Sequence, residues 1–198
     1  MELDLVHDIQ AAYRKTIDSM SRPGLISNIS SQAEKLSLKI GCFDATLLLV
    51  FMFFDIEITF KVCSEREQEI AQIINQLTYA KTAELENADF ILVLHDARPQ
   101  DLERALRAAW PGKLLDPHKG AAIIFEADAV TNDRDLVLTG PGIAKENRIK
   151  VQTTESWVDI RAEINCEYPL GIELIITDRD DNLLCLPRTT QIARQVTD

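Results

Sequence analysis

Residues 89–94 (DFILVL) constrain the fold most, because their apolar side chains follow one another without alternation. A strand of this kind has no face for solvent, so it belongs in the middle of a sheet that is covered on both sides. Helix-like and strand-like segments alternate around it, and the chain ends in a predicted β-hairpin. We therefore predict an α/β fold, a three-layer sandwich around a mixed β-sheet, with residues 1–198 forming a single domain.

The predicted helices have apolar residues at steps of three or four positions. The first helix must end at residues 21–24 (SRPG), because proline disfavours helical geometry in the residue before it and glycine permits a reversal. Its apolar face consists of Leu5, Ile9, Tyr13, Ile17 and Met20. Further helices are predicted over residues 31–53, 65–79, 99–109 and 154–166.

The predicted strands are short apolar or alternating segments between turn residues. Near the end of the chain, residues 171–177 and 183–186 flank the polar turn 178–182, which is the arrangement of a β-hairpin. No internal repeat, low-complexity segment or linker divides the chain. The other predicted strands cover residues 25–30, 56–63, 89–94, 121–125 and 136–138.

The net charge is −11, from 21 Lys and Arg against 32 Asp and Glu. Affinity for nucleic acid comes mainly from basic side chains that neutralise phosphates, so this balance argues against nucleic acid as a partner. It still permits a small anion held by a few local arginines. The most apolar run, residues 45–54, is too short for a membrane span, which needs about 20 residues, so we expect a buried core element and no membrane partner.

The N-terminus has no basic leader ahead of an apolar stretch, so we predict no secretory signal and expect a cytoplasmic location. The four cysteines are far apart in the sequence and form no C-x-x-C pair. We therefore expect free thiols in a reducing compartment and no metal site.

Thr139-Gly140-Pro141-Gly142 follows a predicted strand. Backbone N–H groups in such a segment can surround an anion such as phosphate. The plain alternative is a type II turn with Pro141 second and Gly142 third. Because there is no Lys-Ser/Thr pair and no G-x-G-x-x-G pattern, spacing alone favours the turn over a nucleotide site.

Arg22 precedes Pro23 and Gly24 at the end of the first predicted helix. Its guanidinium suits the oxygens of a phosphate or phosphonate group. It equally suits a solvated position at a helix C-terminus, where the helix dipole favours a cation.

Arg188 precedes Thr189 and Thr190 after the last predicted strand. An arginine beside two hydroxyl groups is suited to binding an oxyanion. With equal weight, the threonines would cap a last helical turn over residues 191–196.

Two further candidates have structural explanations. Asp55, where the apolar run ends, is either a general base or a cap, and the cap is favoured. Gly171 closes a bend at residues 168–171 (YPLG) that leads into a strand. The three histidines are scattered without a carboxylate or serine pattern, so we expect surface or hydrogen-bonded roles for them. The catalytic residues therefore stay unassigned.

Taken together and in order, these segments resemble the H-subunit family of the bacterial carbon–phosphorus lyase system (PhnH family). The resemblance spans nearly the whole chain, although residues 62–113 match only in element type. At His118 the family has glutamate, so no acid role carries over to that position. The matching segments are Tyr13-Arg14, the apolar helix ending at Asp55, and residues 20–24, 117–121, 138–143, 169–174 and 186–190.

The resemblance implies a cytoplasmic homodimer with a fold like the large domain of pyridoxal-phosphate transferases, but without the cofactor. It also implies partners among the other carbon–phosphorus lyase subunits. The assembly uses ATP and an alkylphosphonate to make alpha-D-ribose 1-methylphosphonate 5-triphosphate in organic phosphonate catabolism. Because the displacement of adenine is attributed to another subunit, the resemblance implies a supporting role for this chain, with no cofactor of its own.

Such a reaction brings two polyanions together, so arginines and backbone N–H groups must offset their repulsion. We expect the segments 22–24, 139–142 and 188–190 to converge on one concave surface near the dimer axis. The alternatives are a pure scaffold for the partner subunits and a small pyridoxal-phosphate enzyme. The enzyme would need a Schiff-base lysine in a pocket, whereas the candidate lysines lie in polar turns. They are Lys113, Lys119, Lys145 and Lys150.

Overall fold

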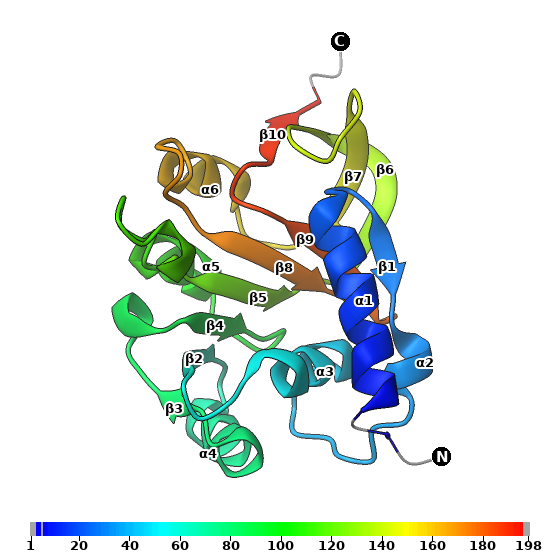
Figure 1. Ribbon diagram of the computed structural model, residues 1–198, viewed down its shortest axis with the longest axis vertical. Coiled ribbons are helices and arrows are strands. Elements are labelled where there is room, and N and C mark those ends of the chain that lie inside the picture. Colours follow the sequence, from blue (N-terminus) through cyan, green and yellow to red (C-terminus); the bar gives the residue numbers. More distant parts are fainter. Residues whose placement is uncertain (1–2, 5, 196–198) are drawn as a thin grey trace.

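The computed structural model describes residues 3–4 and 6–195, and a seven-stranded mixed sheet forms its centre (Figure 1). Strands β2, β3, β4, β5 and β8 are parallel, whereas β9 and β1 add antiparallel pairings at one side. In spatial order the strands are β1 (Ile26–Asn28), β9 (Asn182–Leu186), β8 (Glu173–Thr177), β5 (Ala122–Glu126), β4 (Phe90–Val93), β2 (Thr59–Cys63) and β3 (Lys81–Thr82).

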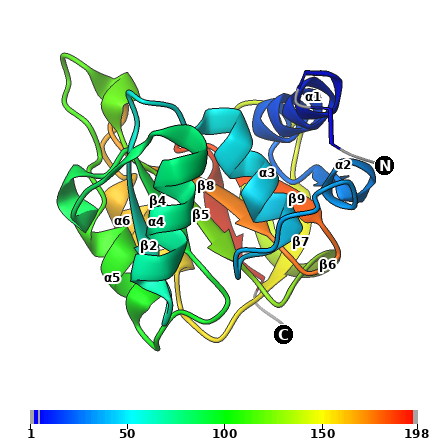
Figure 2. The ribbon, with the colours of Figure 1, turned by 90° about the horizontal axis from the view of Figure 1, so that it is seen from below.

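Helices cover both faces of this sheet, which confirms the predicted α/β class (Figure 2). One face carries α1 (His7–Ser21), α2 (Ser30–Ala33), α3 (Asp44–Phe53) and α4 (Glu67–Thr78). The other carries α5 (Asp101–Ala108) and α6 (Val158–Ile164). Two short 3₁₀ turns, η1 (Leu85–Asn87) and η2 (Pro117–Lys119), precede β4 and β5.

Each face of the sheet has its own hydrophobic core because side chains alternate along a strand. In β5, Ile123 and Phe125 enter the core under α5 and α6, while Ile124 enters the core under α1–α4. β4 divides in the same way, with Ile91 on one side and Leu92 on the other. The predicted two-sided burial of residues 89–94 is therefore confirmed for this strand.

A separate three-stranded antiparallel sheet was not predicted. It consists of β10 (Gln191–Arg194), β6 (Ala129–Thr139) and β7 (Asn147–Gln152) in that order. β6 extends the predicted strand 136–138 in the N-terminal direction. β7 carries mostly polar residues, so its sequence lacks the apolar pattern from which strands were predicted. The small sheet packs against the α6 side of the core through residues such as Leu138 and Ile149.

The predicted helical turn over residues 191–196 is wrong in its described part. Gln191 pairs with Thr139 and Arg194 with Leu136, so the segment is strand β10. The free edge of β6 offers backbone hydrogen bonds that outweigh the local preference. Val196 lies outside the described residues.

The predicted helix over residues 31–53 is also wrong, because it consists of two helices, α2 and α3, with a non-helical link. Gly41 has φ +103°, and Phe43 is extended. The backbone N–H of Phe43 donates to a carboxylate oxygen of Glu126 over 2.5 Å, so the link is held against the end of β5 instead of continuing the helix.

The remaining predicted elements are present with shifted ends, including α1, α4, α5 and the β8–β9 hairpin. The helix predicted over 154–166 begins only at Val158. Leu5, assigned to the face of the first helix, lies outside the described residues. Within the described part, no helix combines the length and apolar character that a membrane crossing requires.

Candidate functional site

A cavity of about 740 Å³ lies at the amino ends of the parallel strands β4, β5 and β8. Its floor is apolar, with Met20 and Phe53 from the helical layer beside Phe90 and Ile175 of the sheet. Its rim comes from three segments that are distant in the sequence. They are Pro117–Gly120, Tyr168-Pro169 and Pro187–Thr189. Of the predicted site residues, Arg188 and Thr189 line this cavity.

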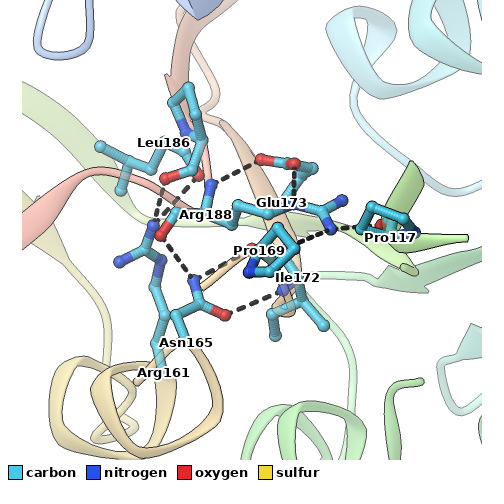
Figure 3. A network of polar contacts seen from close by, with 9 residues as sticks. Pro117, Arg161, Asn165, Pro169, Ile172, Glu173, Leu186 and Arg188 are labelled. Atoms are coloured by element: carbon cyan, nitrogen blue, oxygen red, sulfur yellow. Dashed lines mark hydrogen bonds and ion pairs between the residues drawn. The ribbon is translucent and has the colours of Figure 1, made fainter. Parts of the chain in front are cut away.

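Arg188 is held by the protein on several sides (Figure 3). Its Nε donates to Glu173 Oε1 and its backbone N–H to Glu173 Oε2, both over 2.6 Å. Its Nη1 donates to the carbonyl oxygens of Pro117, over 2.5 Å, and Pro169, over 3.3 Å. Glu173 therefore balances the charge of Arg188, and the guanidinium joins η2 to the loop before β8.

A second arginine, Arg161 of α6, donates hydrogen bonds to the segment 186–190 from inside the core. It is only 2% exposed. Its Nη1 donates to the carbonyl of Thr190 over 2.9 Å. Its Nη2 donates to the carbonyls of Leu186, over 3.3 Å, and Pro187, over 2.5 Å. Burial lowers the pKa of Arg161 to about 10, a value at which the group is still charged at neutral pH.

Asn165, one helical turn after Arg161, completes the network (Figure 3). Its Oδ1 accepts from the backbone N–H of Ile172 over 2.8 Å, and its Nδ2 donates to the carbonyls of Ile172 and Arg188 over 3.1 and 3.4 Å. Arg161 of α6 and Asn165 at its C-terminal end thus fix both the entry to β8 and the segment after β9.

Arg161, Asn165 and Glu173 were not among the site residues predicted from the sequence. A signal was present for Arg161, because it stands four residues after Trp157 on the apolar face of the predicted helix. An arginine at such a position is rarely buried without a specific partner. Glu173 and Asn165 gave no comparable signal, since their roles depend on Arg188 approaching from another strand.

The turn at residues 139–142 has the type II geometry that spacing favoured. The N–H of Ile143 donates to the carbonyl of Gly140 over 3.2 Å, and Gly142 has φ +83°. A Cβ at Gly142 would overlap the carbonyl oxygen of Ser21, and one at Gly140 would lie 2.9 Å from the carbonyl oxygen of Thr189. The turn is therefore packed between the end of α1 and the segment 188–190.

The three motif segments thus lie side by side, but only one contributes to the cavity. Arg22 is outside the cavity lining, and its Nη2 pairs with Asp18 Oδ1 at 3.0 Å with both side chains more than half exposed. This is the solvated position at a helix end, one of the two alternatives considered. Pro23 and Gly24 continue a turn in which the N–H of Leu25 donates to the carbonyl of Arg22 over 2.9 Å.

Thr139, Asp55 and Gly171 have local roles in this structure. Thr139 ends β6, opposite Gln191. Asp55 Oδ1 accepts the N–H of Glu57 over 2.8 Å and forms an Asx turn after α3. Gly171 has φ +139°, and a Cβ there would approach Asn165 Oδ1 to 2.6 Å, so this bend needs glycine.

Of the three histidines, His7 begins α1, and the other two lie at opposite edges of the sheet. His118 lies in η2 and lines the cavity. His95 follows β4 at the opposite, carboxyl edge, where its Nδ1 lies 2.8 Å from Oε2 of the buried Glu126. Its ring stacks on Phe43 with centroids 4.9 Å apart. The hydrogen bond to Glu126 raises the pKa of His95 above its usual value.

Residues 3–193 match the family model described as "Bacterial phosphonate metabolism protein (PhnH)". A similar curated protein is the putative C-P lyase subunit protein HtxG of Stutzerimonas stutzeri, 28% identical over 92% of this chain and 85% of that protein. Another is alpha-D-ribose 1-methylphosphonate 5-triphosphate synthase subunit PhnH of Rhizobium meliloti (strain 1021), 23% identical over 97% of this chain and 94% of that protein.

Proposed function

The chain belongs to the PhnH family of bacterial phosphonate metabolism proteins, and on this premise we propose that it is a non-autonomous subunit of the carbon–phosphorus lyase system. It supports the synthesis of alpha-D-ribose 1-methylphosphonate 5-triphosphate from ATP and an alkylphosphonate. The observation that carries this proposal is the match to the family model over residues 3–193. The names of the two relatives agree with it.

The geometry of the cavity favours a supporting role. Its best-placed cation, Arg188, already pairs with Glu173 and two carbonyl groups, so the rim is a fixed surface. We propose that this rim, with the neighbouring turns at 22–24 and 139–142, is a ligand-binding or interface surface. We assign no catalytic residue on it.

The proposal includes an assembly and a location. The chain acts in the cytoplasm as a homodimer together with other carbon–phosphorus lyase subunits. ATP and phosphonate are substrates of the complex, and this chain carries no cofactor of its own. The fold is proposed to resemble the large domain of pyridoxal-phosphate transferases, and the parallel strands with helices on both faces support that comparison.

Reconstitution of the complex tests the proposed function. The partner subunits are purified from the source organism with and without this chain, and formation of the ribose 1-methylphosphonate triphosphate from ATP and methylphosphonate is followed by phosphorus NMR. Product should form only when this chain is present, and the chain alone should form none. Equal product without it, or efficient turnover by the chain alone, would refute the proposal.

A pure scaffold is the second candidate, and the engagement of Arg188 within the protein favours it. Exposed apolar side chains also suit an interface, since Leu115 is 92% and Tyr168 76% exposed. The variant Arg188→Ala separates the candidates. Loss of assembly without any ligand binding by the isolated chain supports the scaffold, whereas intact assembly with lost turnover supports a ligand site.

A pyridoxal-phosphate enzyme is the remaining alternative. Lys119 lines the cavity and is the candidate Schiff-base residue for such an enzyme. Addition of pyridoxal phosphate to the purified chain should leave the visible absorbance spectrum equal to that of the free cofactor. A new band that Lys119→Ala removes would favour the enzyme instead.

A further inference from the structure

Two buried hydrogen-bond donors beside the segment 186–190 have no partner among the described residues. They are Arg161 Nε and Thr190 Oγ1. Both residues are only 2% exposed, and they are already linked by the bond from Arg161 Nη1 to the carbonyl of Thr190, over 2.9 Å. A buried donor without an acceptor is costly, so two of them in one neighbourhood point to an acceptor that the chain itself does not provide.

The charge of Arg161 shows which kind of acceptor fits. No ion pair joins Arg161 to a carboxylate in the described part of the chain, and Glu173 is the one acidic group that raises its pKa. Both oxygens of Glu173 already accept from Arg188. Two guanidinium groups thus share one carboxylate, which leaves a net charge of about +1 in a region of low dielectric constant. Water would satisfy the donors but would leave that charge unbalanced.

We propose that Arg161 Nε and Thr190 Oγ1 form a binding site for a tetrahedral phosphorus oxyanion, phosphate or phosphonate, behind the rim of the cavity. An arginine and a hydroxyl group both donate to such oxygens. The choice of phosphorus over other oxyanions rests on the proposed function. Arg188 and Thr189 of the same segment line the open cavity, so the site lies directly behind the cavity rim.

The variant Thr190→Val tests the site without disturbing a hydrogen bond of the protein. Valine has nearly the same shape, and the hydroxyl it replaces has no described partner, so the variant should keep or slightly raise the unfolding temperature. Its affinity for the anion should nevertheless fall about tenfold, because a hydrogen bond to a charged group is lost. Thr190→Ser keeps the hydroxyl and should bind as the wild type does.

The matched control is Thr46→Val. Thr46 is also buried, but its Oγ1 lies 2.9 Å from Thr177 Oγ1, so removal of this hydroxyl breaks a bond within the protein. This variant should unfold at a lower temperature and keep the wild-type affinity for the anion. Arg161→Met removes the charge itself and should abolish binding if it folds, and the threonine variants decide the question if it does not.

The measurement is the unfolding temperature of the full chain at increasing inorganic phosphate or methylphosphonate, with sodium chloride at equal ionic strength as reference. Stabilisation by a ligand of the folded state grows with its concentration, which yields an apparent Kd for each variant. The comparison of phosphate with methylphosphonate identifies the preferred anion. A wild type that neither ligand stabilises beyond chloride would overturn the site, as would equal affinities for wild type and Thr190→Val.

This outcome is independent of the reconstitution experiment. The chain alone binds or does not bind the anion, whatever the complex does. Binding without a contribution to the synthase would leave the site in place and refute the proposed function. A required subunit without anion binding would leave the function in place and refute the site.

Discussion

Arg161 and Arg188 contact the same segment, yet their charges are balanced in different ways. Arg188 meets a carboxylate at 2.6 Å, while Arg161 meets only carbonyl groups. A buried ion pair adds little over an apolar pair, but loss of one partner leaves an uncompensated charge. A substitution at this site is therefore expected to lower stability mainly through the unpaired charge that it leaves on the remaining partner.

Glu173→Gln should show this effect. The amide cannot balance the charge of Arg188, whose side chain is only 13% exposed, so the free energy of unfolding should fall by about 3 kcal/mol in urea titrations. The exposed pair Arg194–Asp159 is the control, and Asp159→Asn should cost less than about 1 kcal/mol. Equal losses for the two variants would mean that Arg188 does not depend on its partner.

His95 should make stability depend on pH. Its pKa is raised by the hydrogen bond to Glu126, so the folded state binds the proton more tightly than the unfolded state, whose pKa is near the ordinary histidine value of 6.5. The stabilisation is complete below that pH and is lost as the pH rises through the folded pKa.

The difference in free energy of unfolding between the wild type and His95→Gln should therefore shrink as the pH rises above 6.5. The titration of the His95 ring proton by NMR measures the folded pKa directly. A midpoint at or below the ordinary histidine value would contradict the role given to Glu126. Asp96, which also raises this pKa, and Arg179, which lowers it, do not reverse the sign.

At the scale of elements, the connections decide which segments meet. The turn at 139–142 leads from β6 past the end of α1 and touches the segment between β9 and β10. Its glycines provide the positive φ values and the space that this crossing needs. The turn therefore couples the small sheet to the cavity rim without lining the cavity.

Gly142→Ala tests this close approach. Alanine at φ +83° is strained, and its Cβ would overlap the backbone oxygen of Ser21, so the free energy of unfolding should fall by about 3 kcal/mol. Gly41→Ala, at φ +103°, is the matched control, because its Cβ meets the end of the flexible Arg66 side chain and should cost about 1 kcal/mol. Urea titrations measure both, and similar losses would argue against the backbone contact.

At the scale of the whole molecule, one sheet serves two hydrophobic cores. Ile124 and Phe125 are neighbours in β5 but enter opposite cores. Neither core can form without the strands they share, so both should be lost together. This geometry leads to the prediction that residues 1–198 unfold as one domain.

Ile124→Ala and Phe125→Ala should each lower the free energy of unfolding by about 3–4 kcal/mol. Both residues are at most 1% exposed. In a Trp110→Phe background, Trp157 fluorescence reports one core and far-ultraviolet circular dichroism reports the whole chain, so their urea transitions should coincide in each variant. Two separate transitions would show that the cores, or the small sheet, are independent units.

Local patterns in the sequence determined the α/β class, the buried strands, the final hairpin and the two glycine turns, because each depends on side-chain periodicity or on backbone conformations that few residues adopt. The family resemblance came from the order of those turns along the chain. Tertiary structure alone decided that residues 191–194 form a strand, that the helix over 31–53 is interrupted, and that Arg188 pairs with Glu173. These outcomes depend on a strand edge, a buried carboxylate and a counter-charge supplied from distant parts of the chain, which no local pattern encodes.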